Sequence, residues 1–179
     1  MEEFVLLSLS GLFTFTLLIF FTFLLENMER SLVIIKPDAV QRGLVGEITS
    51  RFEKKGLKIV GFKMMRLDDA ILQQHYAHVA GKPFFRELSR FMSSSPVVVM
   101  CLEGLNAVEV VRLVCGISPT DMGSIRGDLS LSSQRNIVHS SDLVESAKKE
   151  IERFFSDSEL FEYDKTEWIH TLAEAEHHV

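Results

Sequence analysis

Apolar residues in residues 28–179 alternate between short continuous runs and helical spacings. Short runs rich in β-branched residues predict strands over residues 31–35, 57–62, 97–102 and 136–139. Apolar residues three and four positions apart predict helices over residues 44–55, 68–79, 83–92, 106–115 and 142–154. No internal repeat and no Pro/Gly-rich linker interrupts this succession. The pattern indicates one continuous domain.

Capping residues mark the ends of the predicted helices. Gly56 and Gly116 stand where a helix C′ glycine belongs, and Asp68 or Asp69 can cap the helix that follows. We expect Pro83 to open a helix and Asn106 to cap another. The last helix begins with a D-x-x-E capping box formed by Asp142 and Glu145.

The order of the longer elements predicts the fold. With the two helices over residues 68–92 left aside, the order is β-α-β-β-α-β. It favours an α+β, ferredoxin-like split βαβ fold, in which a four-stranded antiparallel sheet carries helices on one face. The other face needs a cover, and self-association supplies one. Val97, Val99 and Cys101 are the apolar strand residues expected to face it.

Residues 1–27 differ sharply from the rest. Residues 4–25 are 22 consecutive uncharged residues, six of them Phe, and as a helix they would span roughly 33 Å, enough to cross a membrane. A cleaved signal peptide is disfavoured, because Glu2 and Glu3 lead and no small-residue cleavage site follows. Two interpretations stay open. The segment is a membrane anchor with the following domain in the cytoplasm, or Met28 is the true start and the protein is cytoplasmic.

Charge and cysteine content exclude several classes of protein. The 179 residues carry a net charge of −6, and residues 28–179 carry 19 basic and 22 acidic residues, a net charge of −3. A sequence pI near 5.5 argues against a nucleic-acid binder. Two cysteines without a C-x-x-C motif exclude a disulfide framework and a cysteine zinc site.

Standard phosphate-binding and nucleophile motifs are absent. The sequence contains no G-x-x-x-x-G-K-[ST] loop, no G-x-G-x-x-G fingerprint and no G-x-S-x-G elbow. Single polar residues instead stand at the ends of predicted elements, namely Lys36, Tyr76, Arg112, Arg126, Asn136, His139 and Glu150. Each has an ordinary structural explanation when taken alone. Arg112, for example, complements a helix dipole.

Eight strings in register resemble one family over residues 29–155. They are IKPD at 35–38, QRGLVGE at 41–47, HY at 75–76, KPFF at 82–85, SPVV at 95–98, EG at 103–104, IRGD at 125–128 and RNIVHSSD at 135–142. The last continues as N-[IV]-[IV]-H-x-S-D-x-x-x-S-A, which is highly specific. Residues 28–155 are thus similar to nucleoside diphosphate kinases, and residues 156–179 form a C-terminal extension that resembles the family poorly.

The resemblance implies a ping-pong reaction through His139. This residue takes the γ-phosphoryl group of ATP or another nucleoside triphosphate and passes it to a nucleoside diphosphate. Imidazole is nucleophilic near neutral pH without a separate base, because its neutral form is well populated. Glu150 is expected to orient the ring with Ser141 assisting, and Tyr76 to lie beside it. Either ring nitrogen of His139 is a candidate for the attacking atom.

The resemblance also implies how the nucleotide binds. Arg112, Arg126 and Ser118 hold the phosphates, Lys36 and Asn136 reach the sugar hydroxyls and a nearby phosphate, and Phe84 stacks on the base. Mg²⁺ bridges phosphate oxygens with few or no protein ligands. Because the base edges are scarcely contacted, we expect little base specificity. The family also implies a homo-oligomer, a dimer on the open sheet face assembled into a hexamer or a tetramer.

Some positions depart from the family pattern. The loop over residues 118–124 is a few residues shorter than usual, which predicts weaker dimer–dimer contact, and Ser118 replaces a Thr. Ser133 stands where an apolar residue commonly lines the base. His170, His177 and His178 are expected in an exposed tail. Two other functions are alternatives. The intact polar set disfavours a membrane-tethered nucleotide-binding scaffold without turnover, and a ferredoxin-like RNA binder would need aromatic side chains on an exposed sheet face and more basic charge.

Overall fold

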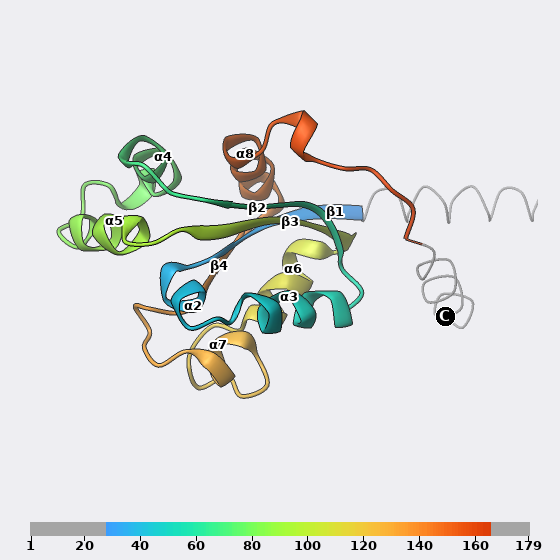
Figure 1. Ribbon diagram of the computed structural model, residues 1–179, viewed down its shortest axis with the longest axis horizontal. Coiled ribbons are helices and arrows are strands. Elements are labelled where there is room, and N and C mark those ends of the chain that lie inside the picture. Colours follow the sequence, from blue (N-terminus) through green and yellow to red (C-terminus); the bar gives the residue numbers. More distant parts are fainter. Residues whose placement is uncertain (1–27, 166–179) are drawn as a thin grey trace, which may run out of the picture.

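A computed structural model describes residues 28–165 as an antiparallel four-stranded sheet with strand order β2-β3-β1-β4 (Figure 1). The strands are β1 (Met28–Ile35), β2 (Lys58–Met65), β3 (Val97–Leu105) and β4 (Val138–Ser140). All four predicted strands are present. The first three are longer than predicted, because β3 pairs with β1 from Met28 to Ile35 and with β2 from Lys58 to Met65. The last begins later than predicted, because Ile137 has φ +71° and interrupts the extended backbone.

Two crossover helices cover one face of the sheet. These are α3 (Val45–Lys54) and α6 (Ala107–Cys115), which lie below the sheet in Figure 1. Val33 and Ile35 of β1 pack there with Ile48 and Phe52 of α3 in one fully buried cluster. Burial of this apolar surface is the main stabilising term on this side. This half of the fold is as predicted.

The other face of the sheet is also covered, contrary to the prediction. Helices α4 (Asp69–His75) and α8 (Val144–Phe154) lie above the sheet in Figure 1, and α5 (Phe85–Ser93) lies at its left end. Val97, Val99 and Cys101 are fully buried in a cluster with side chains of α4, α5 and α8. The prediction was wrong because it set aside the helices between β2 and β3. Helices α4, α5 and α8 cover the sheet face that a second copy of the chain was expected to cover.

Three of the predicted helix caps are present in the structure. The Asp68 side chain accepts a hydrogen bond from the Ile71 N–H at 2.8 Å. Gly56, with φ +89°, closes α3 in a Schellman arrangement, in which its N–H donates to Glu53 and the next N–H donates to Phe52. Gly116, with φ +74°, ends α6.

Three predicted helix starts differ from the structure. Asn106 precedes α6 but has left-handed φ and ψ and makes no side-chain cap, and the Val108 N–H instead donates to Glu29. The expected Asp142–Glu145 box is wrong, because α8 begins after Leu143 without a side-chain cap. Helix α5 begins at Phe85, so Pro83 lies in the preceding turn.

Short elements complete the described chain. Two helices were not predicted, α2 (Pro37–Gln41) and α7 (Ile125–Leu129), and the predicted helix over residues 68–79 ends at His75 and continues as η1 (Ala77–Val79). After α8 and η2 (Asp157–Glu159), residues 160–165 run beside β2. The Phe161 N–H donates to the Val60 carbonyl at 2.8 Å, and the Tyr163 hydroxyl donates to the Ile59 carbonyl at 2.9 Å.

The predictions for both ends of the chain concern residues outside the described range. Residues 1–27 and the three histidines at 170, 177 and 178 lie outside the described residues. Within residues 28–165, no helix combines the length and apolar character that a membrane crossing needs.

Candidate active site

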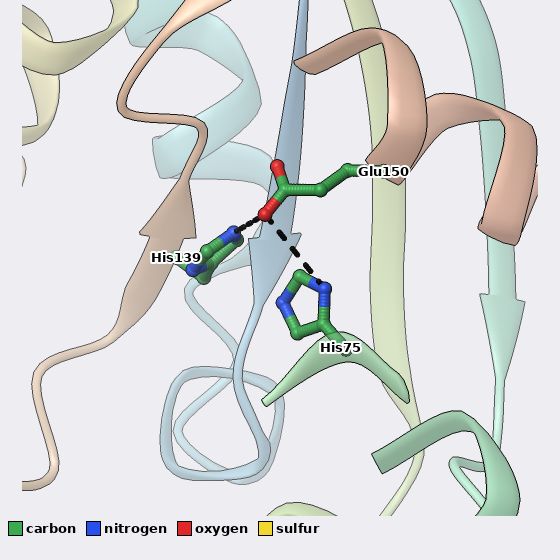
Figure 2. Close-up of side chains that lie close together, drawn as sticks. All are labelled: His75, His139 and Glu150. Atoms are coloured by element: carbon green, nitrogen blue, oxygen red, sulfur yellow. Dashed lines mark hydrogen bonds and ion pairs between the residues drawn. The ribbon is translucent and has the colours of Figure 1, made fainter. Parts of the chain in front are cut away.

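The site is built where β4 meets helices α4 and α8. His139 pairs with Ile34 of β1, so both side chains lie on the sheet face that α4 and α8 cover. Glu150 projects from α8 towards the His139 ring, and His75 comes from the end of α4 (Figure 2). Three elements distant in sequence thus converge on one imidazole.

A chain of hydrogen bonds fixes the His139 ring. Its Nε2 lies 3.1 Å from Glu150 Oε1, and the Ser141 hydroxyl donates to Glu150 Oε2 at 2.6 Å (Figure 2 shows the first pair). The Ser141 oxygen in turn accepts the Leu32 N–H of β1 at 3.1 Å. The carboxylate is therefore tied to the sheet through Ser141 and to the ring through His139.

The electrostatics keep Glu150 ionised. Burial raises the pKa of this carboxyl, but the hydrogen bonds from His139 and Ser141 outweigh it and leave the pKa below its usual value. An ionised carboxylate only accepts hydrogen bonds, so the proton of the neutral His139 ring lies on Nε2. The lone pair is then on Nδ1, which makes no hydrogen bond to any residue in the range 28–165.

Two buried aromatic side chains stand beside His139. The His75 ring meets the His139 ring edge-on with centroids 4.5 Å apart, and the Tyr76 centroid lies 6.5 Å from that of His139. Burial and the charge of Glu150 raise the pKa of Tyr76, so the phenol is neutral at physiological pH. Its hydroxyl has no hydrogen-bond partner among the described side chains and backbone.

Lys36 and Asn136 form a second pair where β1 ends. The Lys36 ammonium donates to the Asn136 side-chain oxygen, while its backbone N–H donates to the Ile137 carbonyl at 2.8 Å. Lys36 is only 8% exposed. Burial, and then the charge of Arg126, lowers the pKa of Lys36 to about 8. A cation held in this way gains from a nearby anion.

Arg126 is fixed next to His139 by backbone carbonyls. Its guanidinium donates to Gly116 and, at 2.7 Å, to the carbonyl of Val138, the residue before His139. Its buried Nε has no partner within the described part of the chain. Burial and the charge of Arg112 lower the pKa of Arg126. Arg126 is thus held against the strand that carries His139, and its charge repels that of Lys36.

The loop before Arg126 depends on one close backbone approach. Ser124 caps α7 by accepting the Gly127 N–H at 3.0 Å, and it donates to the Asp121 carbonyl at 2.6 Å. A Cβ on Gly127 would lie 1.9 Å from the same carbonyl oxygen. Only glycine fits there, which gives a physical reason for the IRGD string around Arg126.

Arg112 lines a cavity with Arg126 and Asn136. The cavity has a volume of about 610 Å³, reaches Ser140 beside His139, and carries Glu29, Glu109 and Asp142 on its wall. Ser118 is not among the lining residues. Its hydroxyl lies 2.6 Å from the Thr120 hydroxyl, and its N–H donates to the Asp121 carboxylate at 3.0 Å.

Phe84 lies in a different cavity. This one has a volume of about 840 Å³ and is also lined by Asp38, Phe91, Gln134 and Arg135. Phe84 is 53% exposed, so one ring face is open to a ligand. The Lys36–Asn136 pair joins the two cavities, because Pro37 and Arg135, the chain neighbours of this pair, line the second cavity while Asn136 lines the first.

The structure groups the predicted residues into three sets. His139, Glu150 and Ser141 are hydrogen-bonded together with Tyr76 alongside. Arg112, Arg126 and Asn136 line the first cavity, with Lys36 bonded to Asn136. Phe84 and Ser118 lie apart from both sets. Sequence reasoning missed His75, whose side chain is only 1% exposed. The string HY at 75–76 was its only signal, and a helix-end histidine has no periodic signature.

Comparison with known proteins identifies the family. The family model for nucleoside diphosphate kinase matches residues 29–160. The chain is 53% identical over 140 residues to the nucleoside diphosphate kinase of Parabacteroides distasonis, covering 76% of this chain and 92% of that protein. It is 52% identical over 153 residues to the Pyrococcus horikoshii protein of the same name, covering 82% and 98%.

Solved structures agree. A halophilic nucleoside diphosphate kinase from Halobacterium salinarum in complex with CDP superposes with a TM-score of 0.75 at 42% identity, covering 79% of this chain and 97% of that one. A transition-state mimic of the Borrelia burgdorferi enzyme with vanadate and ADP gives 0.75 at 34% identity, covering 81% and 97%. Together with the His139 site, these matches establish that the chain belongs to the nucleoside diphosphate kinase family.

Proposed function

We propose that this protein transfers the γ-phosphoryl group of a nucleoside triphosphate to a nucleoside diphosphate through a phosphohistidine on His139. The observation that carries the proposal is the hydrogen-bonded series Ser141–Glu150–His139, which leaves Nδ1 of His139 with the free lone pair. Phosphoryl transfer needs little proton chemistry from the protein, so an oriented nucleophile among cations is a sufficient apparatus.

The reaction balances as two displacements at phosphorus. In the first, the Nδ1 lone pair of His139 forms an N–P bond as the bond from the γ-phosphorus to the β-phosphate oxygen breaks, and the diphosphate leaves. The Nε2 proton stays on the ring, and Glu150 compensates the positive charge that develops there. In the second, a terminal oxygen of another nucleoside diphosphate attacks the phosphorus and His139 leaves.

The nucleotide would span the two cavities. The base stacks on the open face of Phe84, the sugar lies at the Lys36–Asn136 pair, and the phosphates extend towards Arg112, Arg126 and His139. A phosphate group there would offset the repulsion between Lys36 and Arg126. Ser118 would need to release its bond to Thr120 in order to join the phosphate contacts. Because stacking accepts any base, broad nucleotide acceptance follows.

Magnesium would enter with the nucleotide. The cavity wall near His139 carries Arg112 and Arg126, which suit phosphate oxygens, and Glu29, Glu109 and Asp142, which suit a cation or its water ligands. These residues fit Mg²⁺ held mainly by phosphates, as Mg²⁺ keeps several waters and few protein ligands. The bound ion would neutralise phosphate charge.

Incubation with labelled ATP tests the proposal. The wild-type protein should become labelled at His139 through an acid-labile, alkali-stable bond and should pass the label to any added nucleoside diphosphate. His139→Ala should lose both labelling and exchange, and His78→Ala, which changes an exposed histidine, should lose neither. Near wild-type turnover by His139→Ala would overturn the assignment.

We also propose that the catalytic domain works in the cytoplasm, in a membrane-anchored form if residues 1–27 belong to the native protein. The intact mass of the native protein decides between the two starts. Recovery in the membrane fraction of a protein whose mass corresponds to a start at Met28 would contradict this proposal.

A further inference from the structure

His75 is a buried histidine in direct contact with the proposed nucleophile and with a cation. Its side chain is only 1% exposed, and its ring also meets the rings of Tyr76 and Phe154 edge-on, at 4.7 and 5.2 Å. One atom, Nδ1, lies 3.8 Å from Glu150 Oε1 and 3.4 Å from a terminal nitrogen of Arg153 (Figure 2 shows the first pair).

Arg153 defines the protonation of that nitrogen. A guanidinium only donates hydrogen bonds, so Nδ1 of His75 accepts and its proton lies on Nε2. Burial, followed by the charge of His139, lowers the pKa of His75 to about 3, and the charges of Arg153 and His78 act in the same direction against the opposing carboxylate of Glu150. The ring is therefore neutral near pH 7 and does not compete with His139 for a charged pair with Glu150.

Arg153 is a potential competitor for the same carboxylate. Arg153 and Glu150 are three residues apart on α8, a spacing at which side chains of opposite charge meet on a helix surface. An ion pair between them would draw Oε1 away from Nε2 of His139. Instead, the guanidinium donates to His75 Nδ1, while Oε1 stays 3.1 Å from His139.

We propose that His75 is a positioning residue for the transfer reaction: its neutral ring accepts the Arg153 guanidinium and so keeps the Glu150 carboxylate on His139. This inference rests on the proposed function, since it concerns the ring that takes the phosphoryl group. His75 itself acts through Arg153 and Glu150.

A pair of substitutions and a rescue test the inference. His75→Phe keeps a ring but offers Arg153 no acceptor, so kcat should fall by roughly tenfold to a hundredfold while KM for nucleotides stays unchanged. The double variant His75→Phe/Arg153→Met should recover most of the lost kcat, because the guanidinium that would pair with Glu150 is then absent. A double variant as slow as His75→Phe, or a His75→Phe variant with wild-type kcat, would overturn the inference. His78→Phe on the neighbouring turn is the matched control.

Smaller substitutions keep the test valid if the Phe variant folds poorly. His75→Asn and His75→Ala both remove the ring, but only Asn places an acceptor oxygen near the position of Nδ1. We expect Asn to retain kcat within about threefold of wild type and Ala to lose roughly tenfold or more. Equal losses in the two variants would contradict the role assigned to Nδ1.

The tautomer of His139 gives a readout that does not depend on turnover. ¹⁵N NMR of the unphosphorylated protein should show the proton of His139 on Nε2 in wild type, a mixture in His75→Phe, and Nε2 again in the double variant. An unchanged His139 tautomer in His75→Phe would count against the inference even if that variant is slow. If wild-type protein fails to label with ATP, the proposed function fails instead, and the NMR result still reports on His75.

Discussion

At the scale of single residues, the site combines an imidazole nitrogen with a free lone pair and cations that lack an anionic partner within residues 28–165. His139 Nδ1 has no partner within residues 28–165, and Arg126 has a buried Nε without one. Lys36 is buried near Arg126, and its ammonium donates to the neutral side chain of Asn136. Buried groups of this kind are costly unless a ligand completes them. The unliganded site therefore gives up stability that nucleotide phosphates would restore.

The lowered pKa of Lys36 predicts a decline of activity in mild alkali. Lys36 carries its charge below its pKa of about 8 and loses it above, so phosphate binding to the free enzyme should weaken as the pH rises. We expect kcat/KM to fall by about tenfold between pH 7 and pH 9, whereas kcat declines at higher pH because bound phosphate favours the charged amine. Lys36→Arg keeps its charge and should flatten this decline. A wild-type profile that is level to pH 9.5 would contradict it.

The exposed ring of Phe84 predicts uniform binding of bases. Phe84→Ala should raise KM for all nucleotides by similar factors, about 5- to 150-fold, since stacking contributes about 1–3 kcal/mol per base whatever its identity. The half-exposed ring adds little to the core, so the melting temperature should hardly change. Steady-state kinetics with four nucleoside diphosphates measures this. A rise in KM confined to one base would mean that Gln134 or another residue of this cavity hydrogen-bonds to the base edge.

At the scale of elements, two helices owe their positions to distant segments. Helix α8 is fixed through Glu150 and Ser141 to β1, and the first turn of α6 is capped by Glu29 of β1 across 79 residues of sequence. The carboxylate of Glu29 accepts a hydrogen bond from the Val108 N–H, and its negative charge interacts favourably with the positive end of the helix dipole. Because Arg112 projects from α6, this cap also helps to position that guanidinium at the first cavity.

Removal of that cap should therefore weaken the fold. We expect Glu29→Ala to lower the free energy of unfolding by about 0.5–2 kcal/mol, and Glu29→Gln to lower it less, because an amide oxygen still accepts the Val108 N–H. Urea denaturation followed by circular dichroism gives the measurement. Glu53→Ala, at an exposed position of α3, serves as the comparison. Equal stability of Glu29→Ala and wild type would show that water replaces the cap without cost.

At the scale of the whole molecule, both sheet faces are buried within one chain, so assembly must use other surfaces. Phe62 and Met64 of β2 are 48% and 60% exposed, and Ile117 and Met122 on the loop around Ser118 are more than 80% exposed. Exposed apolar side chains that cluster in this way mark association surfaces. We propose that the protein forms dimers that assemble further, as a hexamer or a tetramer, and that the short loop over residues 118–124 makes dimer–dimer contact the weaker step.

A protein that starts at Met28 should then dissociate to dimers in mild urea before it unfolds. Sedimentation velocity across a urea series, with circular dichroism at each step, separates the two events. Met122→Ser should move the first step to lower urea and leave the unfolding step in place, since the side chain is exposed within one chain. A stable monomer at micromolar concentration, or a hexamer that unfolds in a single concerted step, would be inconsistent with this assembly.

The sequence alone determined the four strands, the two crossover helices and the family. Each depends on local information: apolar runs that stop at Pro37 or Gly56, helical spacing, and the unbroken string around His139. The proposed nucleophile, His139, and the polar residues around it could be named for the same reason, because the family strings contain them in order.

Only the tertiary structure decided what covers the second sheet face and how the His139 ring is held. The amphipathic patterns of helices α4, α5 and α8 indicate that each helix buries one side, but they do not indicate which face of the sheet it packs against. The tautomer of His139, the caps from Glu29 and the contact of His75 with Arg153 all join residues from separate elements. Such contacts leave no period in the sequence. They exist only because the packed sheet brings β1, β4, α4 and α8 to one place.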